Sequence, residues 1–397
     1  MAAAAPDPAA ARVEDFSRAQ WVALLIVVCT GFSSQMVMPL WIGAVIDDLS
    51  LTAQAAGRIG SYEFMSVAVV SIFVALRIRS FPTLTTVAAG MFLLIVGNSW
   101  AAFAGSETTL IAARMLCGIG KGLVVAITFS LVAGSPRPTS SFAILNVMYA
   151  VFATGFYLLV PHAIRWNGAA GAFLVMAGVA VLGSLFMIKF PRSRLNASQI
   201  SGLKIWQLPR FGLLGIVSLI ILWTGHNVVW TFVERIGVRN GLDIAAIGGV
   251  LSLSAFITIA GPALARLVDT RLGFGLPMLV AIGLKIIAVF LLAYATAPSV
   301  YVVVVPAFML LSLFITPYVL GILSLADPAG RLAAASSAAM TAGGSIGAFV
   351  GGATVGQLGY SGLSWVAGSF FLAFTIIIAL IAPLATRSAR AAVAASA

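Results

Sequence analysis

Two basic residues, Arg114 and Lys121, stand in the segment ARMLCGIGKG, residues 113–122, whose other residues are mostly apolar or glycine. On an α-helix a spacing of seven residues returns almost to the same face, and Gly118 and Glu107 fall on that face as well. A guanidinium and an ammonium on one face can bind a carboxylate, and a buried lysine changes its protonation state more readily than an arginine. The helix is therefore predicted to present an acidic mouth followed by two cations that contact a bound anion.

Glu63 is the single acidic residue near the middle of an apolar stretch, and it has two interpretations. A carboxylate surrounded by hydrocarbon is costly unless it finds a partner. It can alternate between a neutral and a charged form, which would make it the carrier of a coupled proton, or it can form a static ion pair with Arg114 or Lys121. In the same way, Arg114 either contacts a solute or braces its own helix against Glu63 and backbone carbonyls.

The segment LWTGHNVVW, residues 222–230, combines His226 and Asn227 with Trp223 and Trp230 at helical spacing. This pattern predicts an aromatic-walled contact for a ring-bearing solute, or a packing histidine that is hydrogen-bonded. The remaining candidate solute contacts are polar residues of other apolar stretches, namely Ser34, Gln35 and Tyr318.

Lys285 is a further basic residue deep in an apolar stretch, and it must either reach a polar surface or find an internal acceptor. Pro39, Pro306 and Pro317 can bend the helices that contain them. The chain has two histidines and two well-separated cysteines, with no cluster of metal-ligand residues and no phosphate-binding loop. Neither a metal ion nor a cofactor is therefore expected.

The composition shows what must position these residues. Of 397 residues, 61% are hydrophobic and 8% are charged, and the mean hydropathy is +1.11. A soluble domain carries about a quarter charged residues, so this chain is expected to be an integral membrane protein. About 20 apolar residues cross a bilayer as one helix. The sequence divides into twelve such runs: 20–45, 54–76, 82–104, 109–134, 140–162, 168–190, 211–234, 244–267, 275–297, 299–325, 331–357 and 362–384.

The net charge of +11 reflects topology and does not indicate nucleic-acid binding. If the N-terminus is cytoplasmic, fifteen of the 22 Lys and Arg residues face the cytoplasm, four face outward, and three lie within the runs. The cytoplasmic group is Arg12, Arg18, Arg77, Arg79, Arg137, Lys189, Arg192, Arg194, Lys204, Arg210, Arg266, Arg271, Arg331, Arg387 and Arg390. The outer group is Arg58, Arg165, Arg235 and Arg239. This excess predicts a multi-pass protein of the plasma (inner) membrane with both termini in the cytoplasm.

A basic break at residues 189–210, with five cations and no acid, divides the twelve runs into two sets of six. The expected organisation is a disordered cytoplasmic N-terminus (1–18), a six-helix bundle (19–190), a cytoplasmic linker (191–209), a second six-helix bundle (210–385) and a cytoplasmic tail (386–397). Weak similarity at an offset of 192 aligns Ser34 and Gln35 with His226 and Asn227. The halves are therefore predicted to be repeats related by a pseudo-two-fold axis, with a site between them.

This architecture resembles the major facilitator superfamily of secondary transporters. The segment LIAARMLCGIGKG is similar to the fourth-helix pattern of that family, in which an Arg (here Arg114) is followed by glycines (Gly118 and Gly120). The resemblance implies an all-α fold of twelve transmembrane helices in two six-helix bundles. It also implies that helices 1, 4, 7 and 10 line a central cavity, where Arg114 and Lys121 would lie.

The loops that the family uses for gating are only partly similar here. The loop VALRIRSFPTL after the second helix keeps Arg77 but lacks the Asp and glycines of the family pattern. The equivalent loop ARLVDTRLGFG after the eighth helix has Asp269 and Arg271, so the resemblance implies gating roles for Arg77, Asp269 and Arg271. The fifth helix lacks the glycine–proline signature of many drug/proton antiporters, and a glycine string appears in the eleventh helix instead, at 343–352.

Together these patterns predict a secondary active transporter that moves a small organic solute by alternating access. The excess of buried cations favours an organic anion such as a carboxylate, and Glu63 is predicted to couple its transport to protons, by symport or by exchange. The alternative is a proton-driven exporter of amphipathic or cationic compounds, with Glu63 as the partner of the cation. An enzyme would need a nucleophile–base motif, which is absent, and a receptor would need no buried titratable groups. The expected partners are the solute, protons and the lipid bilayer, and the protein is expected to be a monomer.

Overall fold

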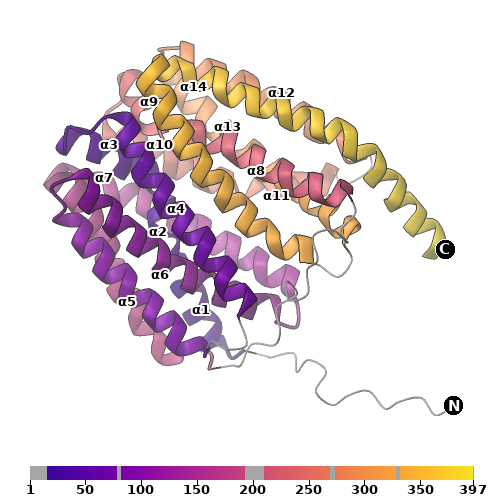
Figure 1. Ribbon diagram of the computed structural model, residues 1–397, viewed down its shortest axis with the longest axis horizontal. Helices are drawn as coiled ribbons and strands as arrows, with labels where there is room; N and C mark the ends of the chain where they lie inside the picture. The colour runs from indigo at the N-terminus through magenta and orange to yellow at the C-terminus, as the bar shows by residue number, and fades with distance from the viewer. Residues whose placement is uncertain (1–15, 78–81, 193–209, 269–272, 328–330, 397) are drawn as a thin grey trace.

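The computed structural model of the protein describes residues 16–77, 82–192, 210–268, 273–327 and 331–396, and these ranges contain helices and no strand (Figure 1). The first half comprises α1 (Arg18–Gly31), α2 (Ser33–Met36), α3 (Met38–Asp48), α4 (Ala53–Leu76), α5 (Thr83–Ala102), α6 (Glu107–Ala133), α7 (Pro138–Leu185) and the 3-10 helix η2 (Phe186–Lys189). The second half comprises α8 (Arg210–Trp230), α9 (Val233–Arg239), α10 (Ile244–Ile257), α11 (Ala260–Val268), α12 (Gly275–Tyr294), α13 (Pro298–Ala326) and α14 (Arg331–Ser396).

The helices account for the predicted membrane passes. Within the described ranges, nine helical segments are long and apolar enough to cross a membrane. Two of them, α7 and α14, bend back at Gly168 and Gly359, whose positive φ angles of 54° and 69° suit glycine, so each can supply two passes. The interrupted series α1–α3 supplies one more, and the structure is consistent with the twelve expected helices.

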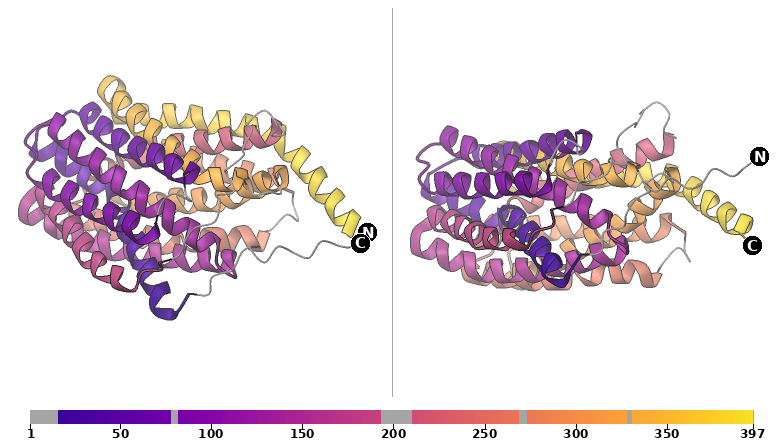
Figure 2. Two further views of the ribbon diagram at one scale, coloured as in Figure 1. Left: turned by 60° about the horizontal axis from the view of Figure 1, so that its bottom comes forward. Right: turned by 90° about the horizontal axis from the view of Figure 1, so that it is seen from below.

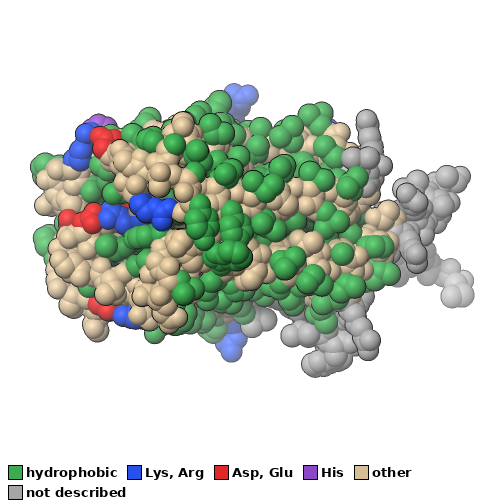
Figure 3. Space-filling model, turned by 90° about the horizontal axis from the view of Figure 1, so that it is seen from above, with side chains coloured by type: hydrophobic (Ala, Val, Ile, Leu, Met, Phe, Trp, Pro, Cys, Tyr) green, Lys and Arg blue, Asp and Glu red, His purple; other side chains and the backbone are tan. Residues whose placement is uncertain are grey.

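The outer surface of the helices is apolar. Large hydrophobic side chains such as Phe92, Phe103 and Val303 are more than 60% exposed. Figure 3 shows hydrophobic side chains over most of one face, with the acidic side chains of that face gathered at its left-hand end. Such a surface suits the hydrocarbon of a bilayer, where helices satisfy their own backbone hydrogen bonds. The protein is a multi-pass membrane protein.

The two halves form two helical bundles that lie side by side with their helices along a common axis (Figure 2). They touch where α4 meets α14 and where α7 meets α10. At the first contact a Cβ atom on Gly57 would lie 2.6 Å from the carbonyl oxygen of Ala348 and 2.8 Å from the Cα atom of Gly352, so the backbones approach too closely for any larger residue. The glycine string at 343–352 therefore has a packing role.

The first membrane pass is broken into three pieces in the middle of its length. Pro39 has no N–H to offer to Gln35, and Val37 leaves the helical conformation between α2 and α3. Two side chains donate to neighbouring carbonyls at this break: the Trp41 Nε1–H donates to Ser34 O at 3.1 Å, and the Tyr157 hydroxyl donates to Met36 O. Pro306 and Pro317, by contrast, lie within the continuous helix α13.

Two helices extend into the predicted terminal segments. The N-terminal segment 1–18 overlaps α1, which begins at Arg18 and is capped by the hydroxyl of Ser17, an oxygen acceptor that suits an N-cap. In the predicted tail, 386–397, α14 continues as a helix to Ser396. Residues 1–15 and 193–209, which hold most of the predicted N-terminal segment and linker, lie outside the described residues.

Candidate functional site

A buried ion pair between Glu63 of α4 and Arg114 of α6 lies inside the first bundle. The Oε2 atom of Glu63 accepts hydrogen bonds from Arg114 Nε at 3.0 Å and from Arg114 Nη2 at 2.8 Å. Both residues are almost inaccessible, with 5% and 0% of their surface exposed. Gly118 allows this approach, because a Cβ atom there would lie 2.5 Å from the backbone oxygen of Glu63.

Arg114 also donates hydrogen bonds to two other protein groups. Nη1 donates to Asn98 Oδ1 at 2.8 Å, and Nη2 donates to the hydroxyl of Ser34, which itself donates to Glu63 Oε1 at 2.6 Å. The guanidinium lies over the rings of Trp41 and Phe173, 5.1 and 5.4 Å from their centroids. Four of the five N–H donors of Arg114 thus have protein acceptors in this conformation, as expected of an arginine that braces its helix.

Lys121, two turns along α6, has a different environment. Its ammonium donates to Gln35 Oε1, which is its single hydrogen-bond acceptor within the described ranges. It lies over the rings of Phe32 and Phe64, at 5.2 and 5.4 Å from their centroids. An ammonium has three donors, so two of them have no acceptor among the described residues, although Lys121 is only 2% exposed.

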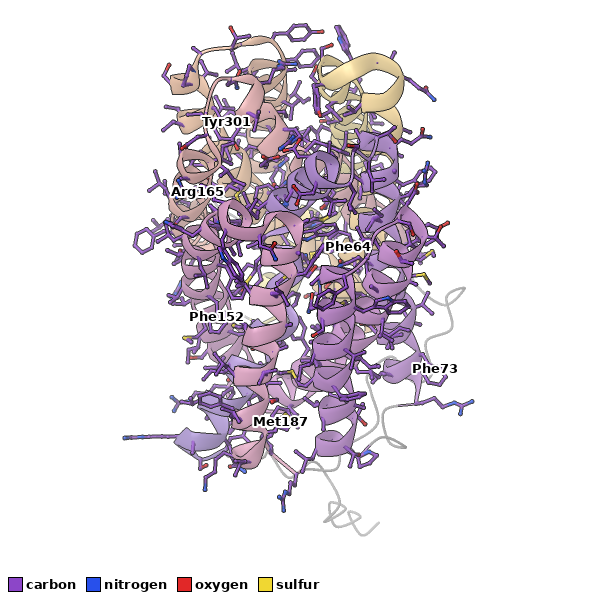
Figure 4. The ribbon with its side chains drawn as sticks, turned by 90° about the vertical axis from the view of Figure 1, so that its left-hand side faces the viewer. Phe64, Phe73, Phe152, Arg165, Met187 and Tyr301 are labelled. Atoms are coloured by element: carbon purple, nitrogen blue, oxygen red, sulfur yellow. The ribbon has the colours of Figure 1, made fainter. Side chains whose placement is uncertain are left out.

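Lys121 lies near mid-depth and close to the contact between the bundles. Figure 4 places Phe64, which packs against Lys121, between Tyr301 and Arg165 toward one end of the helices and Phe73 and Met187 toward the other. Phe64 also meets the second bundle, because a Cβ atom on Gly344 of α14 would lie 3.3 Å from its ring. The ammonium of Lys121 therefore lies where a bound solute could contact both bundles.

In the second bundle, Lys285 of α12 reaches an internal set of acceptors. Its ammonium contacts Ser312 Oγ, the Phe308 carbonyl oxygen at 3.1 Å and His226 Nδ1 at 3.2 Å. It also lies 3.6 Å from the centroid of the Phe308 ring. Lys285 is fully buried and does not extend to the surface, so the internal-acceptor alternative is the observed one.

The other predicted contacts of the second bundle lie around the imidazole of His226 or further along the helices. Trp230 stacks on His226, with centroids 5.9 Å apart, and Trp223 meets it edge-on at 5.1 Å. The amide of Asn227 donates to Trp223 O at 2.9 Å, within its own helix. The hydroxyl of Tyr318 donates to Ala265 O at 3.2 Å and is buried between α13 and α11, away from the His226 group.

The end of the bundles that carries Asp47, Glu107 and Arg235, which we call the distal end, is rich in ion pairs. Arg235 of α9 donates to both carboxylate oxygens of Asp47 at 2.6 and 2.8 Å and also pairs with its neighbour Glu234. Because Asp47 lies in the last turn of α3 and Arg235 lies in α9, this contact joins the two bundles. Glu107 pairs with Arg58 of α4 at 2.7 Å, so it faces the same helix as Arg114, which pairs with Glu63.

Of the three predicted gating residues, Arg77 is the one that lies among the described residues. Arg77 is exposed and lies 5.9 Å from the centroid of the Phe73 ring. Asp269 and Arg271 lie outside the described residues. Among the described side chains, no group of three His, Cys, Asp or Glu residues is arranged to hold a metal ion.

Sequence reasoning missed several partners of the site, namely Asn98, Trp41, Phe308, Ser312, Asp47 and Glu234. Asn98 and Ser312 are polar residues in apolar runs, and that signal could have identified them. The remaining partners are apolar residues, or acidic residues near helix ends. Their roles depend on which helices pack together.

Comparison with known proteins identifies this architecture. The sequence profile of the Major Facilitator Superfamily matches residues 23–352. The chain belongs to the Major Facilitator Superfamily. The crystal structure of the nucleoside transporter NupG is similar, with a TM-score of 0.71 and 12% identity over 91% of this chain and 98% of NupG. The structure of a mutant of NupG has a TM-score of 0.74 and 12% identity, over 91% of this chain and 99% of the mutant chain.

At this identity the similarity to NupG shows the shared fold alone. No curated protein sequence matches the chain. Membership of the superfamily makes this protein a membrane transporter of a small molecule.

Proposed function

We propose that this superfamily member is a secondary active transporter of a small organic anion, that Lys121 contacts the anionic group, and that Glu63 carries a coupled proton. The observation that supports it most directly is the unused hydrogen-bonding capacity of Lys121. An ammonium at mid-depth that has one protein acceptor is suited to receive a carboxylate, because ionised pairs form the stronger hydrogen bonds.

The charges around α2 support an anionic solute. Glu63 compensates one cation, and its Oε2 atom already accepts two hydrogen bonds from Arg114. Lys121 has no carboxylate within ion-pair distance in the described part of the chain, so the group carries one net positive charge. An anion would complete it, whereas a cationic solute would have to displace Arg114 from Glu63. This weakens the alternative of an exporter for cationic compounds.

The short helix α2 supports coupling between solute and proton. Its adjacent residues Ser34 and Gln35 contact the two parts of the site: Ser34 bonds to Glu63 and Arg114, and Gln35 bonds to Lys121. The helix ends at a break at Val37, where the backbone leaves the helical conformation. An anion bound to Lys121 would weaken the attraction between this cation and the Glu63 carboxylate, and would therefore favour proton uptake by Glu63. By linkage, a proton on Glu63 would equally favour binding of the anion.

A ligand screen by thermal unfolding tests the anion. The panel would hold mono- and dicarboxylates, sugars, cationic amphipaths and nucleosides, the last because NupG is a nucleoside transporter. A ligand at 100 times its Kd stabilises the fold by about 2.7 kcal/mol. We expect carboxylates to raise the Tm of the wild type and of the exposed control variant Lys189→Gln, but not of Lys121→Gln. Stabilisation by cationic compounds alone would contradict the proposal.

A further inference from the structure

The ammonium of Lys285 is bonded by the protein to its full capacity. Its three N–H donors have three acceptors: the carbonyl oxygen of Phe308, the hydroxyl of Ser312 and the Nδ1 atom of His226. The rings of Phe308 and Phe371 lie against it, at 3.6 and 5.2 Å from their centroids to Nζ. Lys285 therefore has no donor left for a solute, and its effect on a solute must be exerted through His226.

This contact selects one tautomer of His226. An ammonium has no lone pair, so an Nδ1–H facing it would bring two donors together. Nδ1 must accept, and Ser312 Oγ at 3.1 Å is a second group that can donate to it. In a neutral imidazole with Nδ1 as acceptor, the proton is on Nε2. No described residue accepts a hydrogen bond from Nε2, so His226 has one N–H donor to offer.

A second unpaired donor lies beside it. Nε1 of Trp223, one turn earlier on α8, is buried and has no hydrogen-bond partner in the part of the chain that the structure describes. The two rings meet edge-on, with centroids 5.1 Å apart. A buried donor without an acceptor costs about 1–3 kcal/mol, so its retention calls for an explanation.

The surroundings leave only the edge of His226 available. Phe308 stacks on the imidazole at 4.8 Å and 10°, and Trp230 stacks at 5.9 Å and 15°. The ring is therefore held on its faces by aromatic groups and at Nδ1 by Lys285. The edge of the ring that carries Nε2 can donate a hydrogen bond to a solute.

This donor pair is close to the Lys121 region, across one turn of α14. A Cβ atom on Gly343 would lie 3.0 Å from Trp223 Cβ, and one on the next residue, Gly344, would lie 3.3 Å from the ring of Phe64, which packs against Lys121. The two bundles thus bring Trp223 and Phe64 to adjacent positions of one helix.

We infer that Trp223 Nε1–H and His226 Nε2–H form a subsite for a hydrogen-bond acceptor at the second end of the solute, and that Lys285 is the residue that positions it. The ligand class is an organic anion with a second carboxylate, carbonyl or amide oxygen. This rests on the proposed function, in which Lys121 binds the first carboxylate. A solute that contacts both subsites would connect the two bundles.

The test compares ligands that differ only in the second acceptor. The Kd values of straight-chain dicarboxylates and of monocarboxylates with the same number of carbons, from four to eight, would be measured by thermal shift. In the wild type and in the exposed control Trp166→Phe, the dicarboxylate of the best length should bind more tightly. Trp223→Phe, which removes the N–H and shortens the side chain but keeps an aromatic ring, should reduce this preference about fivefold, as expected for the loss of one hydrogen bond.

Two substitutions of His226 separate positioning from packing. His226→Gln keeps a donor near the Nε2 position and should retain most of the preference for dicarboxylates. The side chain of His226→Asn is shorter, so this variant should lose the preference. Lys285→Met should lose it as well, with little effect on the binding of monocarboxylates. An unchanged preference in Trp223→Phe and His226→Asn would overturn the subsite, as would equal losses in His226→Gln and His226→Asn.

Nitrogen-15 NMR of labelled histidine tests the role of Lys285 without any solute. The chain has two histidines, and the exposed His162 serves as the internal reference. We expect His226 to be the Nε2–H tautomer in the wild type and to lose this preference in Lys285→Met. The Nδ1–H tautomer in the wild type would overturn the positioning role. A wild type that binds no carboxylate would overturn the proposed function and the solute subsite with it, but not the tautomer result.

Discussion

The three cations buried in the membrane region differ in how much of their hydrogen-bonding capacity the protein uses. Arg114 has Glu63, Ser34 and Asn98 as acceptors, and Lys285 has three acceptors for three donors. Lys121 has Gln35 alone. Burial by itself does not distinguish them, because all three are at most 2% exposed. The count of unused donors is what singles out Lys121 as the anion contact and gives the other two supporting roles.

Glu63 should matter both for stability and for coupling, and the two effects can be separated. Glu63→Gln leaves Arg114 buried without its counter-charge, and breaking a buried pair costs about 3–5 kcal/mol. Arg114→Gln should cost a similar amount. The double variant should lose much less stability than the two single variants together, because it has no uncompensated buried charge. Thermal unfolding measures these differences.

The proton role is tested in the same variants by uptake of a bound carboxylate into proteoliposomes. We expect Glu63→Gln and the double variant to exchange solute across the membrane but not to accumulate it in response to a pH gradient. If the folded double variant still accumulates solute with normal pH dependence, Glu63 is a structural partner of Arg114 and no more.

At the scale of helices, close packing places the charged groups. Gly118 brings α6 against the backbone of Glu63, and a Cβ atom there would lie 2.5 Å from that carbonyl oxygen. Gly118→Ala should therefore lower the stability by about 1–3 kcal/mol, the range for overpacking. The same substitution at Gly178, where nothing lies within 4 Å, should be neutral or stabilising because alanine favours helices. Equal Tm values for the two variants would show that α6 can shift freely.

The sequence predicts features within one helix better than contacts between helices. The apolar runs place the membrane passes, Pro39 indicates the break in the first one, and the Glu63–Arg114 pair is one of the two stated alternatives. Spacing along a helix tells which residues share a face, but not what lies opposite. Lys285 and Ser312 come from different helices, so their contact depends on how the helices pack.

At the distal end the same limit applies over a longer separation. Glu107 shares a helix face with Arg114 but pairs with Arg58 of α4, and Asp47 pairs with Arg235, which is 188 residues away. Both contacts depend on which helices are neighbours. The fold class and the passes were therefore predictable, whereas the partners of the site required the structure.

For the whole molecule, the Asp47–Arg235 contact should hold the two bundles together at the distal end. Asp47→Asn removes this link and leaves the pair between Arg235 and Glu234. Exposed ion pairs contribute up to about 1 kcal/mol, which corresponds to roughly a fivefold change in the ratio of two conformations. We expect a larger population with the distal end open. Glu107→Gln, which breaks a pair inside the first bundle, should have no such effect.

Spin labels measure this change directly. Ser50→Cys and Gln357→Cys place labels at exposed positions of the two bundles near the distal end, and both native cysteines are buried. Longer distances should gain weight in Asp47→Asn and not in Glu107→Gln. Identical distance distributions in all three proteins would show that the contact does not determine the conformational equilibrium.

The central claim, that an organic anion is transported through a contact with Lys121, is tested most directly by carboxylate uptake into proteoliposomes containing wild type, Lys121→Gln or Lys189→Gln. The account predicts saturable uptake of a carboxylate by the wild type and by Lys189→Gln. Lys121→Gln should show a KM higher by about tenfold or more, because a hydrogen bond to a charged group contributes about 1.5–3 kcal/mol. Undiminished carboxylate uptake by Lys121→Gln, or saturable uptake of nucleosides or cationic compounds with none of carboxylates, would contradict it.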